Sequence, residues 1–491
     1  MNGVTKMKKK KKLVLAYPNL KWKKFDFHTK WDLNPSVLCL LGKMVEEQVE
    51  VKIVDALFYD LTLEEFIKEI ADYQADYVGL SLLTSEYQEI LHTAAKEIKT
   101  LDPNIVVIAG GVHVTIEYKN VIEDSNIDYA VRGEGEYVLP ALLRYLEGEG
   151  DLPAEGLIYR SEDGVMVEQK QTWIKDLTEL PMADYSLVKM EDYVQVGARY
   201  GPQRPPEFPH ARMVVTRGCP VGCSFCQVES ISGKIVRARS PEQVTDELLY
   251  LKKNFGIKSI VFEDDNIVVK KKFFKELMRQ FIAKDLNLKF ILSNFAIYAL
   301  DDEILDLIVE AGCVGINIAI ESGSQRVMND VVLKPIKLEK IPDLIQSVRE
   351  RGLFVISNFI IGFPGETWEE IRETVSFAEG CGADYVKFFI AMPLKGTKMW
   401  DMARELDAFD IDESQIQINW RFGQITSTDW TSNDISILRA YEWDRINFGT
   451  PERRKRMNEI WGMNDEELAK IRKATRDAVS LAGEPNNMVV N

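Results

Sequence analysis

Long apolar runs, an excess of positive charge and a disulfide-like set of cysteines are all missing from this sequence of 491 residues. No apolar run approaches the roughly 20 residues of a membrane-spanning helix, which argues against a membrane protein. The net charge of −16 and the pI near 5.0 argue against binding of nucleic acid, which needs a clustered basic face. Of the six cysteines, three fall within eight positions and three are scattered. This usage predicts a protein of the reducing cytoplasm and favours a metal site.

The composition is that of an ordinary globular chain, with 46% hydrophobic and 28% charged residues. Its length suggests about three domains. We expect a first domain at 1–148, a linker at 149–210, a second domain at 211–402 and a mostly helical C-terminal domain at 403–491. The linker is expected because six prolines between Pro153 and Pro209 interrupt any long element. At most a short strand pair is expected within it, around Leu157–Tyr159 and Val165–Glu168.

Short β-rich runs alternate with amphipathic stretches in the first domain, which predicts a doubly wound, flavodoxin-like parallel sheet in an α/β fold. The expected strands are Leu13–Tyr17, Val51–Asp55, Tyr77–Leu80, Ile105–Ala109 and Tyr129–Val131, and the expected helices are 36–46, 63–71, 85–99 and 116–123. Ligands of such sheets bind at the carboxyl ends of the strands. Small or polar residues follow three of these strands, namely Ser81 and Thr84, then Gly110, Gly111 and His113, then Gly133 and Glu134.

The second domain repeats the alternation. Its expected strands are Met213–Thr216, Ser259–Glu263, Lys289–Ser293, Gly315–Ile320, Phe354–Ile360 and Tyr385–Ile390, and its expected helices are 241–254, 271–283, 302–311, 338–351 and 367–378. Six βα repeats over ~180 residues are too few for a closed eightfold barrel, so we expect a partial (βα)6 barrel. Helices are expected after it at 433–446 and 464–478.

The strongest motif lies after the first strand of this barrel, where Cys219, Cys223 and Cys226 are spaced as Cys-x3-Cys-x2-Cys. Three thiolates can bind three irons of a [4Fe–4S] cluster, whereas electron-transfer clusters of this type have four cysteine ligands. The missing ligand would leave one iron open to a substrate or cofactor. The alternative is a Cys3His zinc site with His210, although zinc sites usually space their ligands as two close pairs.

The cysteine motif resembles the hallmark of the radical S-adenosylmethionine (SAM) enzymes, and three further turns agree. The resemblance implies that Asp264 and Asp265, after the second strand, hold the amino group of SAM. It implies that Glu321, after the fourth strand, faces the ribose or carboxylate of SAM. Gly362-Phe363-Pro364-Gly365-Glu366, after the fifth strand, is similar to a turn common in these enzymes. Each acid alone could be a solvated loop residue or a helix cap.

A doubly wound domain ahead of the barrel resembles the cobalamin-binding subgroup of these enzymes. The motifs that carry this resemblance are Val54-Asp55-Ala56, Gly110-Gly111-Val112-His113 and Val131-Arg132-Gly133-Glu134-Gly135-Glu136. The resemblance implies that the turns with Ser81, Thr84, Gly110, Gly111, His113, Gly133 and Glu134 contact cobalamin. The alternative is a scaffold domain that has lost its ligand.

One motif departs from the base-off cobalamin domains, which use Asp-x-His-x-x-Gly and a histidine as the lower cobalt ligand. This chain has Asp26-x-His28, but Trp31 stands where the glycine should be. We therefore expect His28 to be a loop residue and not a cobalt ligand.

The resemblance implies a [4Fe–4S] cluster, SAM and cobalamin as cofactors, with a methyltransferase acting on an unactivated carbon as the main activity. In that reaction a 5′-deoxyadenosyl radical abstracts hydrogen and methylcobalamin delivers the methyl group. No general base is required, and no catalytic side chain is predicted. Expected partners are a small-molecule or peptide substrate and an electron donor such as flavodoxin or ferredoxin. Alternatives are a non-methylating rearrangement or oxidative cyclisation with the same cofactors, and a cobalamin or redox sensor without turnover.

Overall fold

The computed structural model describes residues 9–22, 34–197, 204–295, 297–413, 416 and 422–477. The chain divides into two compact units, Met1–Tyr193 and Val194–Asn491, which are described separately. None of the helices in the described part of the chain is long and apolar enough to cross a membrane.

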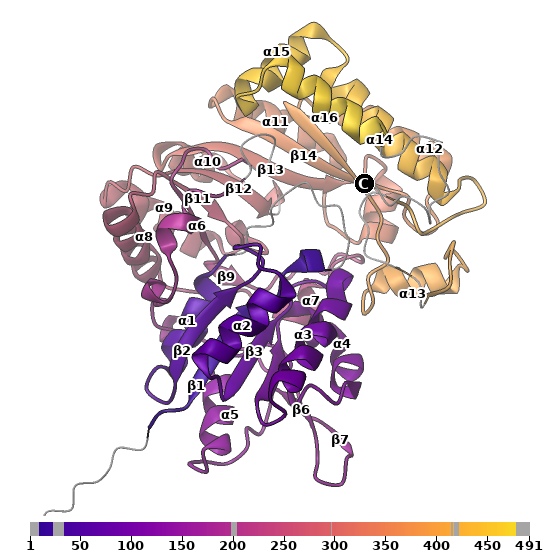
Figure 1. Ribbon diagram of the computed structural model, residues 1–491. Helices are drawn as coiled ribbons and strands as arrows, with labels where there is room; N and C mark the ends of the chain where they lie inside the picture. Colours follow the sequence, from indigo (N-terminus) through magenta and orange to yellow (C-terminus); the bar gives the residue numbers. More distant parts are fainter. Residues whose placement is uncertain are drawn as a thin grey trace, which may run out of the picture. The chain divides into compact units, whose positions relative to one another are not determined.

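The first unit is built on a seven-stranded sheet with the order β2-β1-β3-β4-β5-β6-β7 (Figure 1). Its first five strands pair in parallel, and β6 and β7 continue the sheet antiparallel. The order 2-1-3-4-5 is that of flavodoxin-like folds, as the alternating pattern predicts. The strands are β1 Lys12–Tyr17, β2 Glu50–Asp55, β3 Tyr77–Ser81, β4 Val106–Gly110, β5 Tyr129–Val131, β6 Leu157–Arg160 and β7 Met166–Glu168.

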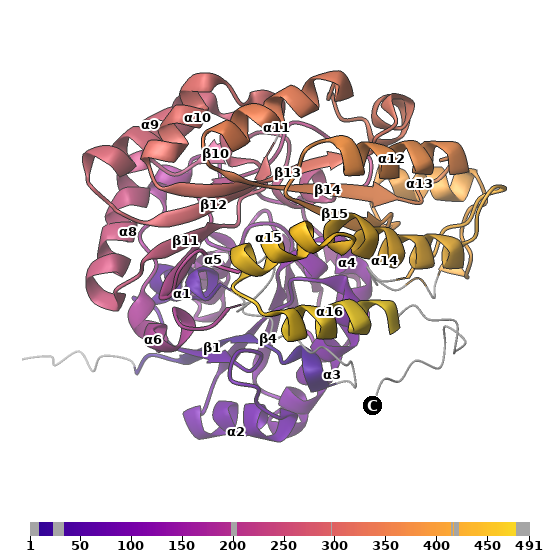
Figure 2. The same ribbon diagram turned by 90° about the horizontal axis from the view of Figure 1, so that it is seen from above.

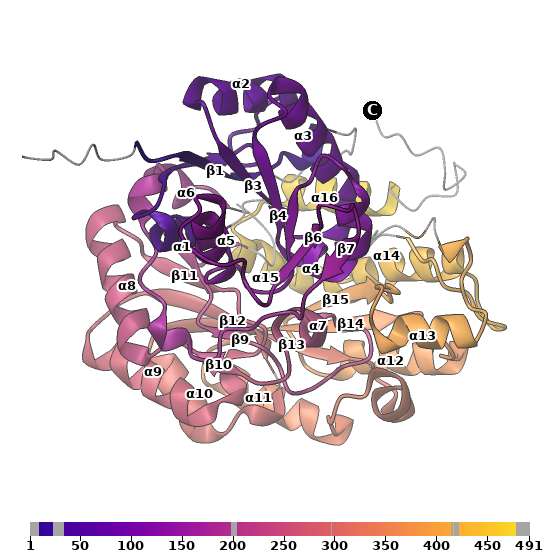
Figure 3. The ribbon, with the colours of Figure 1, turned by 90° about the horizontal axis from the view of Figure 1, so that it is seen from below.

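Helices cover both faces of this sheet (Figure 3). On one face α2, α3 and α4 bury Phe66, Leu91 and Val121, and on the other α1 and α5 bury Leu38 and Leu142. The helices are α1 Ser36–Val45, α2 Leu63–Tyr73, α3 Gln88–Leu101, α4 Val112–Glu123 and α5 Val138–Leu146. The sequence pattern did not predict α5, although Val138, Leu139, Leu142 and Leu143 form its buried face.

Residues 149–193, which we expected as the first part of a linker, are counted with the first unit. They contain β6 and β7, and the short elements α6 (Met190–Tyr193) and two 3-10 turns. The Tyr193 hydroxyl donates to Asp55 Oδ2 at 2.9 Å, and its ring stacks on Phe58 with the centroids 3.8 Å apart. The prolines of this stretch exclude long elements, but they do not prevent short strands from joining the sheet edge.

The second unit is an open six-stranded parallel sheet with the order β8-β11-β12-β13-β14-β15. The outer face of its strands is covered by the intervening helices α8 to α12 (Figure 2). The strands are β8 His210–Met213, β11 Ser259–Phe262, β12 Lys289–Phe295, β13 Cys313–Glu321, β14 Phe354–Ile361 and β15 Tyr385–Ile390; the helices are α8 Pro241–Phe255, α9 Lys271–Ala283, α10 Asp302–Glu310, α11 Ile341–Glu350 and α12 Trp368–Gly380. This is the predicted partial barrel.

The C-terminal helices pack onto the last strands of the barrel. Phe448, Met457 and Trp461 form a buried cluster with Ile356 of β14 and Tyr385 of β15. Asn447 of α14 hydrogen-bonds the backbone of the edge strand β15. Its Oδ1 accepts from the Val386 N–H and its Nδ2 donates to the Val386 carbonyl, each at 2.8 Å. The helices are α13 Lys398–Glu405, α14 Ser432–Phe448, α15 Pro451–Trp461 and α16 Asp465–Asp477. The sequence pattern predicted α14 and α16 only, since α15 buries just Met457 and Trp461.

Candidate functional site

The cysteine motif lies on a loop that begins at the carboxyl end of the first barrel strand. A small antiparallel pair, β9 (Thr216–Arg217) with β10 (Arg237–Ala238), frames this loop, and the Cys219 N–H donates to the Gly233 carbonyl at 3.1 Å. Gly218 has φ +96°, and a side chain there would collide with the Ile235 carbonyl. The loop geometry therefore requires glycine at this position.

The three thiols of the loop lie close enough to act on one another electrostatically. Burial raises the pKa of Cys223 to about 12 and that of Cys226 to about 11, and the neighbouring cysteines add to both shifts. Thiols in such a site lose their protons when they bind a metal, because the thiolate is the ligand. The loop therefore carries three soft ligands that are near enough to influence one another's pKa.

The structure offers no preformed site for a single zinc ion in its described residues. Across the described residues, no three side chains of His, Cys, Asp or Glu converge closely enough to hold one metal ion. A zinc ion needs all its ligands within about 2.0–2.3 Å, whereas a cubane separates its sulfur ligands more widely. His210, the candidate fourth zinc ligand, is the first residue of β8 and packs edge-on against Phe208, with the ring centroids 5.2 Å apart. It lies at the opposite end of the strand from the cysteine loop.

The two predicted acids after β11 support the backbone of the cysteine loop. Asp264 Oδ1 accepts from the Val215 N–H at 3.1 Å and from the Thr216 hydroxyl at 2.7 Å. Asp265 Oδ2 accepts from the Gly218 N–H at 3.0 Å, and Asn266 Nδ2 lies 3.6 Å from the Cys219 sulfur. Burial raises the pKa of Asp264 to about 7. Both acids thus position the loop, and a direct contact with SAM stays a prediction.

Glu321 forms a buried ion pair that the sequence pattern did not reveal. Lys334 Nζ lies 2.8 Å from Glu321 Oε1, and each side chain is 7% exposed. Lys334 Nζ also donates to the Ala319 carbonyl at 2.6 Å. Burial lowers the pKa of Lys334, but the charges of Glu321 and Cys223 outweigh this effect and raise it overall. The pair therefore places one fixed positive and one fixed negative charge beside the cysteines.

The turn after β14 packs directly against the cysteine loop. The rings of Phe363 and of Phe225, which lies between Cys223 and Cys226, have their centroids 6.1 Å apart. The buried Glu366 carboxylate accepts from the N–H groups of Gly362 at 2.7 Å and Phe363 at 3.0 Å, so it closes the turn from inside. Burial raises the pKa of Glu366 to about 8. The four motifs singled out in the barrel thus surround one place.

In the first unit, the turns after β3 and β4 begin side by side at the carboxyl edge of the sheet. Ser81 and Gly110 are register partners at the ends of these strands, and Thr84 lies partly exposed in the turn after β3. The buried His113 ring is hydrogen-bonded through Nδ1 to the Ser85 hydroxyl at 2.9 Å. A side chain on Gly110 would meet nothing within 4 Å, whereas one on Gly111, at φ +95°, would lie 2.6 Å from the Leu82 carbonyl. Gly110 therefore faces open space, and Gly111 is required by the fold.

Gly133 and Glu134, after β5, contact a later segment of the same unit. The Gly133 N–H donates to Thr115 Oγ1 at 3.1 Å, and a side chain on Gly133 would collide with the Thr172 carbonyl. The Glu134 N–H donates to that same carbonyl at 3.3 Å, and its carboxylate accepts from the Ile174 N–H. These contacts explain why the fold of the first unit requires glycine at position 133. A role of Gly133 and Glu134 in binding cobalamin stays a prediction.

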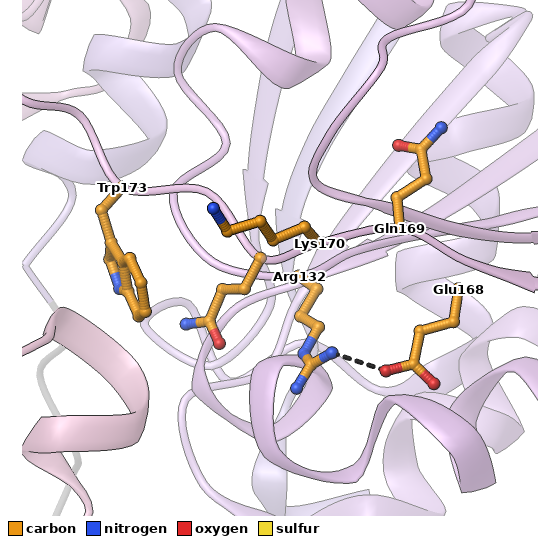
Figure 4. A pocket seen from close by; sticks show the side chains of 6 residues that line it. Arg132, Glu168, Gln169, Lys170 and Trp173 are labelled. Carbon is orange, nitrogen blue, oxygen red and sulfur yellow. Dashed lines mark hydrogen bonds and ion pairs between the residues drawn. The ribbon is translucent and has the colours of Figure 1, made fainter.

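A polar cavity of about 540 Å³ opens beside these residues (Figure 4). Arg132 is held in it by an ion pair with Glu168 at 2.8 Å, and its guanidinium lies 3.9 Å from the centre of the Tyr118 ring. The remaining lining residues are Gln169, Lys170, Gln171 and Trp173. None of these was singled out from the sequence. His28 and Trp31, which carried the prediction about the lower cobalt ligand, lie outside the described residues.

Comparisons with known proteins agree with both halves of this description. Residues 213–378 match the radical SAM superfamily, and residues 28–143 match the B12 binding domain.

Three curated relatives align with most of the chain. An uncharacterized methyltransferase of Pyrococcus horikoshii is 32% identical over 83% of this chain and 86% of its own length. A cytidylyl-2-hydroxyethylphosphonate methyltransferase of Streptomyces wedmorensis is 28% identical over 78% of this chain and 77% of its own length. An anaerobic magnesium-protoporphyrin IX monomethyl ester cyclase of Rubrivivax gelatinosus is 27% identical over 74% of this chain and 65% of its own length.

The fold itself has a solved counterpart. The cobalamin-dependent SAM radical enzyme OxsB superposes with a TM-score of 0.73 at 16% identity, covering 95% of this chain and 72% of that one. At this identity the likeness describes the fold alone.

Proposed function

Because the chain belongs to the cobalamin-binding radical SAM enzymes, we propose that it transfers a methyl group to a carbon atom of a small-molecule substrate. The observation that carries this proposal is the loop with three free thiols, within the radical SAM match, in a chain that also has a B12 binding domain. Methyltransferases are the first two of the relatives described above.

The other cysteines cannot complete the ligand set. Cys39 is buried in α1, Cys313 donates through its thiol to the Gly315 carbonyl at 3.2 Å, and Cys381 is buried at the end of α12. A cluster on Cys219, Cys223 and Cys226 would therefore keep one iron without a cysteine, as SAM binding requires. When bound, the cluster supplies the electron that cleaves SAM, and cobalamin supplies the carrier for the methyl group.

The residues around the cysteine loop would orient and shield these groups. Asp264 and Asp265 fix the loop backbone, and the Phe363 ring packs against Phe225 within the motif. The Glu321–Lys334 pair offers one carboxylate and one ammonium beside the thiols, and such paired charges can hold the amino and carboxylate ends of an amino acid. In the first unit, Gly110 leaves room for a large ligand at the carboxyl edge of the sheet.

The half-reactions can be tested without knowing the substrate. The protein is purified and reconstituted anaerobically with iron, sulfide and cobalamin, then given SAM with a labelled methyl group and reduced flavodoxin or ferredoxin as the proposed electron donor. A methyltransferase forms S-adenosylhomocysteine with transfer of label to cobalamin, and also forms 5′-deoxyadenosine.

Each other outcome identifies an alternative. Release of 5′-deoxyadenosine without S-adenosylhomocysteine indicates a non-methylating rearrangement or cyclisation. Stoichiometric cofactor binding with neither product indicates a sensor. With a true substrate, the product of a methyltransferase gains the mass of one CH2 group for each methyl added.

A further inference from the structure

The inner face of the last two barrel strands can be assigned from ring contacts and register. Phe359 of β14 packs against Phe377 of α12 and against Phe388 of β15, so these side chains lie on the face that the helices cover. Side chains alternate along a strand, so Asn358 and Lys387 point to the opposite, inner face. Asn358 and Lys387 are also register partners on the adjacent strands.

Lys387 is a cation without a counter-ion on this inner face. Among the described residues, nothing forms an ion pair or hydrogen bond with its ammonium group, and its side chain is partly exposed. Burial is the sole cause that lowers the pKa of Lys387, to about 8, so no nearby charge acts on it. Ammonium groups in such surroundings are normally paired, because desolvation disfavours the charged form.

Two asparagine amides beside Lys387 are likewise incomplete. Asn317 of β13 is the register partner of Ile356, two residues before Asn358 on β14, so it lies on the same inner face. The Oδ1 atoms of Asn317 and Asn358 are buried and have no hydrogen-bond partner within the described residues. Asn317 is 8% exposed as a whole residue. Buried polar groups in native proteins are nearly always hydrogen-bonded, so three unsatisfied groups on one face of three adjacent strands indicate a missing ligand.

A cavity with apolar and basic lining lies below these polar groups. It has a volume of about 270 Å³ and lies at the amino ends of the barrel strands, and its lining includes Ile291, Phe354, Ile356 and Trp461 together with Arg204 and Lys289. Trp461 also packs edge-on against Tyr385, two residues before Lys387, with the ring centroids 4.8 Å apart. The inner face thus carries a polar layer in mid-strand above a cavity of apolar and positively charged side chains, which suits an organic anion.

We propose that Lys387 binds an anionic group of the substrate, a carboxylate or a phosphate-type group, while Asn317 and Asn358 hydrogen-bond the polar atoms around it. This inference rests on the proposed function in so far as the ligand is the methyl acceptor. It assigns the acceptor to the class of small organic anions and places its charged end on the inner face of β14 and β15.

The carboxylate of SAM is the other anion that could reach the barrel. The position of Lys387 along its strand distinguishes SAM from the substrate as its ligand. Lys387 is the third of six residues in β15 and therefore lies in mid-strand. The cysteines follow the carboxyl end of β8, and the Glu321–Lys334 pair lies at the carboxyl end of β13. In the proposed function, the Glu321–Lys334 pair beside the cysteines holds the amino acid end of SAM. Lys387 is therefore assigned to the substrate.

Competitive lysine labelling tests this assignment on the full-length holoenzyme without turnover. Acetic anhydride modifies only unprotonated amines, so the labelling of the Lys387 peptide against pH, followed by mass spectrometry, gives the pKa of this residue. The probes are inorganic phosphate, methylphosphonate and acetate, each added alone, and SAM in a separate arm. An anion beside the ammonium raises its pKa, so we expect at least one probe to slow the labelling of Lys387 and to leave other lysines unchanged. Phosphate or methylphosphonate acting alone indicates a phosphate-type group, and acetate acting alone indicates a carboxylate.

Matched variants give a second, independent measurement. We expect Lys387→Met to bind the effective probe about tenfold more weakly by calorimetry, since a charge-assisted bond is lost, and Lys387→Arg to keep most of the affinity. Lys275→Met is the control, because Lys275 lies on helix α9, is absent from the lining of the cavity, and is paired with Asp301 at 3.3 Å and Glu303 at 2.5 Å. SAM affinity should be the same in all three variants.

Two results would overturn the inference. Protection of Lys387 by SAM alone would assign it to the cofactor, and a labelling profile that no probe changes would leave no anion site. Neither readout requires catalysis, so a chain that forms no S-adenosylhomocysteine but responds to the probes would refute the proposed reaction and keep the anion site. A chain that methylates a substrate but shows no response to the probes would refute the anion site and support the proposed reaction.

Discussion

Lys334 and Glu321 form an ion pair at 2.8 Å in which both side chains are 93% buried, next to the thiol of Cys223. Glu321 is the last residue of β13 and has φ +84°. Lys334 comes after a π-helical turn, Val327–Val332, which is capped by Leu333 with φ +59°. The backbone on both sides is thus held in the left-handed region, which non-glycine residues adopt rarely. Two unusual backbone conformations converge on one charge pair.

The first prediction concerns the stability of this pair. Lys334→Met leaves the Glu321 carboxylate buried and alone, so we expect a loss of about 3–5 kcal/mol in the free energy of unfolding. The double variant Glu321→Gln/Lys334→Met should recover most of this loss, because no unpaired charge remains. Urea unfolding followed by circular dichroism measures both.

The control for this pair is an exposed one. Glu466 and Lys470 on α16 lie 2.8 Å apart but are 79% and 72% exposed. Lys470→Met should change the stability by at most about 0.5 kcal/mol. A Lys334→Met variant that behaves like this control would show that the buried charges are not coupled.

The second prediction concerns the cysteine loop. The triple variant Cys219→Ala/Cys223→Ala/Cys226→Ala should lose the iron–sulfur absorbance and all formation of 5′-deoxyadenosine. Cys381→Ala is the matched control, because it removes a buried thiol at the end of α12 and should keep both signals. Iron analysis decides the assignment, since retention of about four irons per chain in the triple variant would place the cluster elsewhere.

The third prediction follows from the raised pKa of Glu366. Burial favours the protonated carboxyl group in the folded state, with a pKa of about 8, whereas the unfolded value is about 4.3. The folded state therefore binds the proton more tightly, and its stabilising contribution is full below about pH 4 and is lost as the pH rises through about 8. Urea midpoints at pH 5 and pH 8.5 should differ more for the native chain than for Glu366→Gln, which has no proton to lose. Equal pH dependence in both chains would mean that the two backbone N–H donors of Gly362 and Phe363 keep the carboxylate ionised.

Much of this site was predictable because each motif follows a strand of regular pattern. Once the six barrel strands were recognised, Asp264, Glu321 and Glu366 had to lie at one edge, since the carboxyl ends of parallel strands meet there. Lys334 could not be found in this way, because it follows an irregular turn and belongs to no motif. Lys387 could have been recognised, because it is the single lysine in the apolar strand Tyr385–Ile390. A strand at the surface would instead alternate polar and apolar residues.

One of the helices that the pattern missed, α15, has a narrow apolar face. α15 begins with Pro-Glu-Arg-Arg-Lys-Arg and buries only Met457 and Trp461, so its place depends on tertiary contacts with β14 and β15 and not on periodicity. The short strand pair expected within the proline-rich segment is present as β6 and β7, but its place at the edge of the sheet depends on antiparallel pairing with β5. Local pattern identifies elements with a broad apolar face, and contacts between distant segments decide the rest.

The last prediction separates the two glycines at the end of β4. A side chain on Gly110 meets open space within the first unit, so Gly110→Leu should leave the folded state intact and obstruct a ligand at this edge of the sheet. Gly111 has φ +95°, and a side chain there would lie 2.6 Å from the Leu82 carbonyl, so Gly111→Leu should destabilise the fold itself by a few kcal/mol, about the cost of a strained backbone with a close contact. The measurements are the thermal midpoint without cobalamin and the cobalamin stoichiometry of the reconstituted chain. We expect Gly110→Leu to keep the midpoint and lose cobalamin, and Gly111→Leu to lose both. If Gly110→Leu bound cobalamin with the native stoichiometry, the space beside Gly110 would not belong to the cofactor, and the ligand edge would have to be sought at the turns after β3 and β5 instead.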